Sequence, residues 1–201
     1  MAQDSIGKPK RVNDPQGMRS RILDVAADLF QRRGYHSTSV QDVVQAAGAT
    51  GGALHHHFPT KKALGLAVIE ERVAREVNAT AIEPVLRADR SKTGVLAFFS
   101  AVAGELERNQ AVTGCPLNNL AMELSLADPD FRHASNAIFE RWVGVLAQRF
   151  QDDDPALAPR QAGALATLVI AAYSGAMAMA KASQSALPLR DCAAQLEKLL
   201  P

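Results

Sequence analysis

The chain has 201 residues, of which 47% are hydrophobic and 21% are charged, with a net charge of +1. This length and apolar share suffice for a globular protein of one to two ordinary domains with a sizeable core. The N-terminal run MAQDSIGKPKRVNDPQ has no apolar segment, and no later run reaches the roughly 18 apolar residues that cross a bilayer. We therefore expect a cytoplasmic protein without a secretory signal or a membrane partner.

Charge is distributed unevenly along the chain. The first 62 residues contain nine lysines and arginines against five aspartates and glutamates, whereas acidic side chains are in excess in the remainder. Residues 1–15 are expected to form a disordered basic arm, which is either a solvated tail or a segment attracted to DNA phosphates. In the second case the arm contributes salt-dependent affinity but reads no sequence. The basic residues at this end are Lys8, Lys10, Arg11, Arg19 and Arg21.

The segment SVQDVVQAAGATGGALHHHF, residues 39–58, has the pattern of two short helices joined by a sharp turn. Apolar residues at helical spacing predict a first helix from about Ser39 to Ala46, with Ser39 as its N-cap. Its apolar stripe can pack against Ala26, Leu29 and Phe30. Gly48 follows, and glycine tolerates the left-handed conformation that ends helices.

Thr50 can cap a second helix that runs to about His57. Leu54 and Phe58 are four residues apart and point inward, which leaves a small, polar outer face. That outer face consists of Gly51, Gly52, His55 and His56. A helix with such a face suits a DNA groove, so residues 39–58 are predicted to form a helix-turn-helix.

The run RILDVAADLFQRRGYHSTSVQDVVQAAGATGGALHHHFPTKKAL, residues 21–64, resembles the N-terminal domain of the TetR family of bacterial transcriptional repressors. ILDVAADLF, GY, VVQAAG and GALHHHFPTKKAL carry the resemblance at the family's spacing. It implies a three-helix DNA-binding domain, a long fourth helix, and a larger helical domain that binds an effector and forms a two-fold dimer. Gly51 stands where many members have a lysine or arginine, and His55 where most have tyrosine. The reading helix therefore has fewer strong anchors for bases and phosphates.

Lys61 and Lys62 open the next helix, which Thr60 can cap. The helix N-terminus and the two ammonium groups together favour a phosphate, and a solvated helix face is the alternative. The resemblance implies that Lys61 contacts the DNA backbone, that His55 and His57 lie near phosphates, and that His56 approaches a base edge.

The three consecutive histidines do not have metal-ligand geometry, because neighbouring helical positions are about 100° apart. No carboxylate or cysteine lies at ligand spacing from them, so we expect no metal and no cofactor. The expected contacts with double-stranded operator DNA are Ser39, Gln41, Thr50, Gly51, Gly52, His55, His56, His57 and Lys61.

The helical pattern continues from Lys62 to about Arg87, and Pro84 is expected to end or kink this helix. A rigid helix leaving the DNA-binding domain can convert a small displacement into a change of spacing between the two reading helices of a dimer. In the family, that is how an effector switches DNA affinity.

The remainder is predicted to be an antiparallel helical bundle, because no stretch alternates as a strand would and no long repeat is visible. Asp128 is the expected N-cap of the helix that starts at Pro129. The predicted helices are Thr93–Asn109, Pro116–Leu126, Pro129–Gln151, Pro159–Ala182 and Leu189–Leu200.

Small residues run along Pro159–Ala182 and allow close helix approach. We expect this helix and Phe131–Phe150 to form a four-helix dimer interface, with a buried core helix as the alternative. The expected domains are the arm 1–15, a DNA-binding domain 16–76 and an effector-binding and dimerisation domain 77–201.

The segment TGCPLNNLAMELS, residues 113–125, places Cys115 directly before a predicted helix. The helix dipole can favour a thiolate there, and a packed small hydrophobe is the alternative. The segment resembles GC-x-x-x-NLA-x-E in a branch of the family that responds to electrophiles such as quinones and reactive aldehydes. It implies a thiol that either reacts with the effector or lines the effector pocket. The pocket residues expected are Cys115, Asn118, Asn119, Glu123 and Trp142.

The sequence thus predicts an all-α homodimeric transcriptional regulator. An enzyme is not expected, because the chain lacks a glycine-rich phosphate loop, a GxSxG motif and metal-ligand spacing. The expected function is a repressor that a small-molecule effector, with a thiol-reactive electrophile as one candidate, releases from operator DNA. A DNA-binding activator or architectural protein without ligand-driven release is the alternative.

Overall fold

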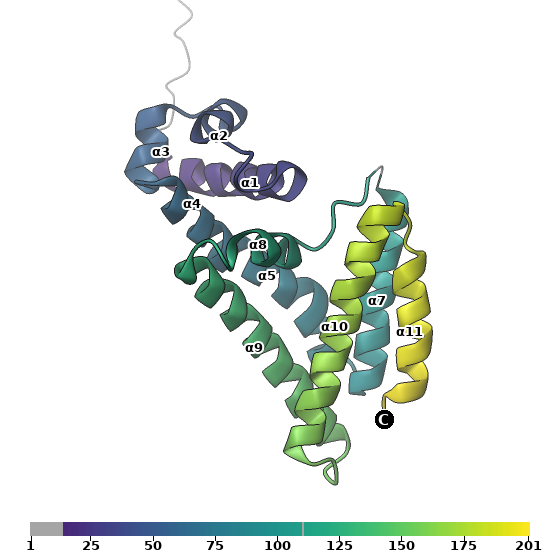
Figure 1. Ribbon diagram of the computed structural model, residues 1–201. Helices are drawn as coiled ribbons and strands as arrows, with labels where there is room; N and C mark the ends of the chain where they lie inside the picture. Colours follow the sequence, from purple (N-terminus) through teal and green to yellow (C-terminus); the bar gives the residue numbers. More distant parts are fainter. Residues whose placement is uncertain (1–13, 110) are drawn as a thin grey trace, which may run out of the picture.

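The computed structural model describes residues 14–109 and 111–201, and every regular element in these ranges is helical. Three helices, α1 (Pro15–Arg33), α2 (Val40–Ala47) and α3 (Gly51–His57), form a small unit at one end of the molecule (Figure 1). Because it contains the helix-turn-helix that the sequence predicts to bind DNA, we call this unit the DNA reader. A long connecting helix follows this unit, and the helices after it form a larger unit that we call the body. The expected all-α fold is confirmed.

Local side-chain caps fix the DNA reader. The Ser39 hydroxyl accepts a hydrogen bond from the Asp42 N–H at 3.0 Å, and the Asp42 carboxylate accepts one from the Ser39 N–H at 2.7 Å, which completes a capping box. Gly48 ends α2 with φ 59° and ψ 30°, the expected left-handed conformation. The Thr50 hydroxyl accepts from the Ala53 N–H at 3.1 Å and begins α3. Gly48 and Thr50 therefore form the turn between α2 and α3, as the sequence predicts.

A single connecting helix leads from the DNA reader to the body. It comprises α4 (Lys61–Val68), η1 (Ile69–Val73), α5 (Ala74–Val77), η2 (Asn78–Ile82) and α6 (Glu83–Arg87), and Thr60 caps its start. The segments η1 and η2 are π-helical turns, which are wider than α-helical ones. Pro84 does not end the helix, which continues to Arg87, because η2 lies before the proline and widens the backbone there.

The body contains α7 (Ser91–Arg108), α8 (Pro116–Leu124), α9 (Pro129–Asp153), α10 (Pro159–Ser183) and α11 (Leu187–Leu199). α9 and α10 run antiparallel, α7, α10 and α11 lie side by side, and α8 crosses the connecting helix (Figure 1). The rings of Phe98, Trp142 and Tyr173 meet with centroids 4.7–5.8 Å apart and form the centre of the body. Asp128 caps α9 as predicted, by accepting from the Asp130 N–H at 2.8 Å.

By length and composition alone, α10 is the one helix in the described parts of the chain that could cross a membrane. The core helix of a globular protein passes the same test, so this is a weak indication. Some large apolar side chains of α10 are exposed in the single chain, notably Leu168 and Met179. An exposed apolar helix face of this kind commonly marks a contact with another protein.

Candidate DNA interface and ligand cavity

Helix α3 is anchored on one side and open on the other. Leu54 and Phe58 are each 3% exposed and hold the helix on the core of the DNA reader. Gly51, Gly52, His55 and His56 are exposed, and a Cβ added at either glycine would meet nothing within 4 Å. The face predicted to enter a DNA groove is therefore unobstructed.

Ser39 and Gln41, the DNA contacts predicted at the start of α2, differ in whether their side chains already form hydrogen bonds. The Ser39 hydroxyl donates to the Asp42 carboxylate at 2.6 Å in addition to capping α2. Hydrogen bonds from Ser39 lower the pKa of Asp42. Gln41 is exposed, and no side-chain hydrogen bond occupies it within the described residues. Gln41 is the freer of the two groups.

The three histidines do not share one surface. His56 and His57 line a groove of about 780 Å³ between α3 and the start of α1, together with Arg21 and Thr50, whereas His55 lies outside it. The rings of His56 and His57 are 5.2 Å apart and nearly perpendicular. Two of the histidines therefore face toward α1, and the third lies on another side of α3.

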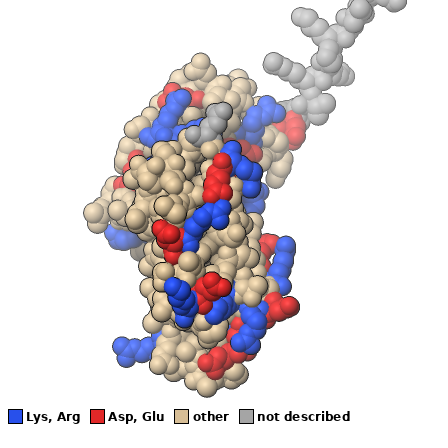
Figure 2. Space-filling view, turned by 90° about the vertical axis from the view of Figure 1, so that its right-hand side faces the viewer, with Lys and Arg blue, Asp and Glu red and all other residues tan. Residues whose placement is uncertain are grey.

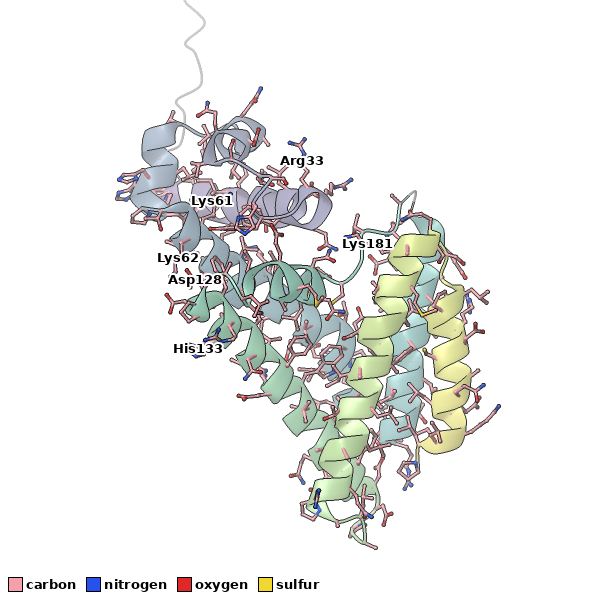
Figure 3. The ribbon with its side chains drawn as sticks, viewed as in Figure 1. Arg33, Lys61, Lys62, Asp128, His133 and Lys181 are labelled. Atoms are coloured by element: carbon pink, nitrogen blue, oxygen red, sulfur yellow. The ribbon has the colours of Figure 1, made fainter. Side chains whose placement is uncertain are left out.

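Lys61 and Lys62 have different surroundings (Figure 3). The Lys61 ammonium group lies 4.4 Å from the centre of the Tyr35 ring and donates to the His36 carbonyl at 3.4 Å. Burial lowers the pKa of Lys61. The Lys62 ammonium group contacts the carboxylates of Asp128 and Asp130 at 2.7 and 2.6 Å. Lys62 thus ties α4 to the start of α9, so the expected pair of phosphate-binding lysines reduces to Lys61.

The basic arm falls mostly outside the described residues, which include neither Lys8, Lys10 nor Arg11. Arg19 forms an ion pair with Glu71 of the connecting helix, and its guanidinium group lies 5.2 Å from the centre of the Phe58 ring. Arg19 is therefore a packing residue. Elsewhere, acidic and basic side chains are intermingled on the face seen in Figure 2.

Helix α8 is bonded directly to the DNA reader. The two carboxylate oxygens of Glu123 accept hydrogen bonds from the backbone N–H groups of Tyr35 and His36, at 2.9 and 2.7 Å. Asn119 donates to the side chain of Gln31 on α1 at 3.0 Å. Gln31 in turn donates to the Gly114 carbonyl at 2.6 Å. These polar groups fasten the turn after α1 to the body.

A groove of about 540 Å³ lies between the end of α1, α8 and α10. It is lined by four of the five predicted pocket residues, Cys115, Asn118, Asn119 and Glu123. Trp142 does not line this groove: it is 1% exposed in the aromatic centre of the body and borders only a space of about 10 Å³. Trp142 is a large side chain on the buried face of α9, and it therefore fills the core.

Cys115 is the residue before α8, as predicted, but its thiol is 3% exposed. Burial raises the pKa of Cys115, although the backbone N–H groups of Leu117 and Asn118 favour the thiolate. The influence of the helix N-terminus is therefore present and is outweighed by desolvation.

A separate cavity of about 270 Å³ lies between α1, the connecting helix, α7, α8 and α10. Val68, Val102, Leu106, Leu120 and Met177 are among its apolar lining residues. Its polar lining residues include Asp28, Gln31, Glu76, Thr80, Glu105, Thr113 and Tyr173. None of these belongs to the predicted pocket. The sequence signal for them was weak, because Glu76 and Glu105 have the pattern of solvated helix faces.

Comparison with known proteins gives two family matches. Residues 22–68 match the model described as bacterial regulatory proteins, tetR family, and residues 92–195 match the LmrA/YxaF-like transcriptional regulator C-terminal domain. An HTH-type transcriptional regulator from Mycobacterium tuberculosis is 30% identical, covering 92% of this chain and 95% of the relative. The HTH-type transcriptional regulator LmrA from Bacillus subtilis is 25% identical, with 90% and 96% covered.

A solved structure of a TetR transcriptional regulator from Chloroflexus aurantiacus is similar throughout. Its TM-score is 0.81 at 27% identity, and the match covers 93% of this chain and 96% of that chain.

Proposed function

The chain belongs to the TetR family of DNA-binding transcriptional regulators, and from this premise we propose that it is a homodimeric cytoplasmic repressor, released from its operator by a small molecule. The observation that carries the proposal is the open face of α3, held in place by Leu54 and Phe58. Two such helices in a two-fold dimer read half-sites about one helical turn of DNA apart.

The proposed DNA contacts are those predicted from the sequence, with α3 in the major groove. Lys61 anchors the backbone, since its ammonium group retains hydrogens beyond the one given to the His36 carbonyl. The glycines of α3 allow the helix backbone to approach the groove closely. The proposed contacts are Ser39, Gln41, Thr50, Gly51, Gly52, His55, His56, His57 and Lys61.

The dimer is proposed to form through α9 and α10. Exposed residues of α10 recur at spacings of four and three, at Ala164, Leu168, Ala171, Gly175 and Ala178. This is the spacing of a helix seam that packs against another helix. Gly144 of α9 and Gly175 are both open, with nothing within 4 Å of an added Cβ, which suits close approach of a second chain. The proposed domain division remains 16–76 for DNA binding and 77–201 for effector binding and dimerisation.

The effector is proposed to bind in the 270 Å³ cavity, because that cavity touches both α1 of the DNA reader and the connecting helix. A ligand there can displace Gln31, whose side chain bonds to Gly114 and Asn119 of the body. The DNA reader can have two positions relative to the body, and a ligand that binds one of them more tightly shifts the equilibrium toward it. The resulting change in DNA affinity is set by the difference in ligand affinity between the two positions.

The first test is fluorescence anisotropy of labelled DNA from the region upstream of this protein's own gene, beside a scrambled duplex and at several salt concentrations. Saturable binding well above the scrambled control supports a specific regulator. Equal, steeply salt-dependent binding to both duplexes counts against specific reading at that site. DNA affinity that no effector alters favours an activator or architectural protein.

An electrophile response is the finer part of the proposal, and Cys115 carries it. The thiol borders the 540 Å³ groove beside α8, whose Glu123 holds the DNA reader. Cys115 is only 3% exposed although it borders the groove, so a bulky group added at its sulfur must displace neighbouring side chains and shift α8. The test is release of operator DNA by a quinone: Cys115→Ser should keep DNA binding and lose release. Equal release from both proteins would refute the role of the thiol.

A further inference from the structure

The 270 Å³ cavity has a marked charge asymmetry. Three of its lining residues are acidic, Asp28, Glu76 and Glu105, and no lysine, arginine or histidine of the described chain lines it. The rest of the wall is largely aliphatic. Because the chain as a whole has nearly equal numbers of basic and acidic residues, this one-sided lining is a property of the cavity and not of the composition.

Two of the three carboxylates have no partner within the described residues. Asp28 pairs with Arg32 at 2.6 Å, whereas neither Glu76 nor Glu105 forms a side-chain hydrogen bond or an ion pair. Two other carboxylates of the same helices are paired, Glu71 with Arg19 and Glu107 with Arg190 at 2.8 Å. Desolvation raises the pKa of Glu76, and the charge of Glu105 raises it further. Glu76 and Glu105 are both exposed, so the two mutually repelling carboxylates lie on the solvent-accessible side of the cavity.

An independent feature of the cavity is the side chain of Tyr173. It is 7% exposed, and it lines the cavity. Within the described residues its hydroxyl forms no bond to nitrogen or oxygen, and its hydrogen-bonding neighbour is the thiol of Cys115, a weak partner. Because the hydroxyl already has the Cys115 thiol as a partner, the aromatic ring is what Tyr173 offers to a ligand in the cavity.

We infer that the cavity binds a small organic cation, an amine or quaternary ammonium with an apolar body. The cationic head would lie between Glu76 and Glu105 beside the Tyr173 ring, and the apolar body would contact Val102, Leu106 and other aliphatic side chains. Carboxylates and an aromatic face are the groups that attract such cations, and aliphatic walls select against small hydrated ions. The effect of the cation on DNA binding rests on the proposed function.

The position of the two carboxylates gives the cation a mechanical effect. Glu76 lies on α5 of the connecting helix, and Glu105 lies on α7 of the body. A cation between them replaces repulsion by attraction and draws the two helices together. Because α5 continues into α4, the pull is transmitted to the DNA reader.

The test is calorimetric titration of the full-length protein, without DNA, with three probes of similar size: benzyltrimethylammonium, benzyl alcohol and phenylacetate. The cation should bind at least about tenfold more tightly than the neutral and anionic probes, a difference of about 1.4 kcal/mol. Glu76→Gln and Glu105→Gln should each weaken cation binding by at least about tenfold. Tyr173→Phe, which keeps the ring, should retain most of it.

Glu70→Gln is the matched control, because Glu70 is an exposed carboxylate of the same connecting helix outside this cavity. It should leave the affinity unchanged. Circular dichroism and thermal unfolding check that each variant is folded. Equal affinity for cation and anion, no measurable cation binding, or unchanged affinity in both Gln variants would overturn the inference.

A second arm adds the cation to the protein–DNA complex. Release of DNA by the cation supports the regulatory role. Cation binding that leaves DNA affinity unchanged would keep the ligand class and refute the proposed effector mechanism.

Discussion

Glu123 makes the bond between body and DNA reader that is easiest to test. Replacing it with alanine removes two charge-assisted hydrogen bonds, to the N–H groups of Tyr35 and His36. Bonds to charged groups contribute about 1.5–3 kcal/mol each. Water can replace the exposed bond to His36, so the pair should contribute about 2–3 kcal/mol of unfolding free energy. Alanine is a better helix former than glutamate, so helix propensity does not account for a loss.

The assays are urea unfolding, which gives the free energy, and thermal unfolding, which gives the midpoint, both at one fixed protomer concentration because dimerisation makes stability depend on concentration. Glu123→Ala should lower the thermal midpoint by about 5–10 °C, and Glu123→Gln, which keeps one acceptor oxygen, by about half as much. Met122→Ala is the matched control, since Met122 is the neighbouring residue and is 87% exposed. If Glu123→Ala stays within about 0.5 kcal/mol of the native protein, the two bonds do not hold the DNA reader to the body.

Four other changes test the remaining sites. Lys61→Ala should weaken binding to specific and scrambled DNA equally and reduce the salt slope by about one; an unchanged slope in anisotropy titrations would contradict a phosphate contact. Gly51→Lys should strengthen binding and steepen the slope by about one, because nothing lies within 4 Å of an added Cβ; weaker binding would show that the groove needs the glycine. Alkylation of Cys115 by N-ethylmaleimide, followed by mass spectrometry, should reach its plateau at a higher pH than alkylation of a cysteine-containing peptide, because the thiolate reacts and burial raises the pKa of this thiol; a plateau at the same pH as the peptide or lower would refute the raised pKa. Leu168→Glu should convert the dimer to a monomer in analytical ultracentrifugation, and an intact dimer would place the interface elsewhere.

Features determined by neighbouring residues could be predicted from the sequence. The caps at Ser39, Thr50, Thr60 and Asp128 were all predicted, because each depends on a hydroxyl or carboxylate within three residues of the N–H that it accepts from. The inward position of Leu54 and Phe58 follows from the helical period in the same way.

Features that depend on distant contacts could not be predicted. Glu123 lines the 540 Å³ groove with three other residues expected in the pocket, but its hydrogen-bond partners lie 88 and 87 residues earlier in the chain and could not be predicted. Lys62 has the same pattern as Lys61 in sequence, and only the approach of α9 separates their roles. The acidic cavity combines residues from five parts of the chain, so its charge appears only when the helices are packed.

The two wide turns of the connecting helix are places where a helix of this chain can lose a residue. Each of Ile69–Val73 and Asn78–Ile82 contains one residue more than an α-helical turn requires. Deleting a residue there lets the turn close to ordinary geometry, so the helix on either side keeps its orientation. A deletion inside α9 would instead rotate everything after it by about 100°. Among relatives, single-residue gaps between the two halves of the molecule should therefore collect in these two turns.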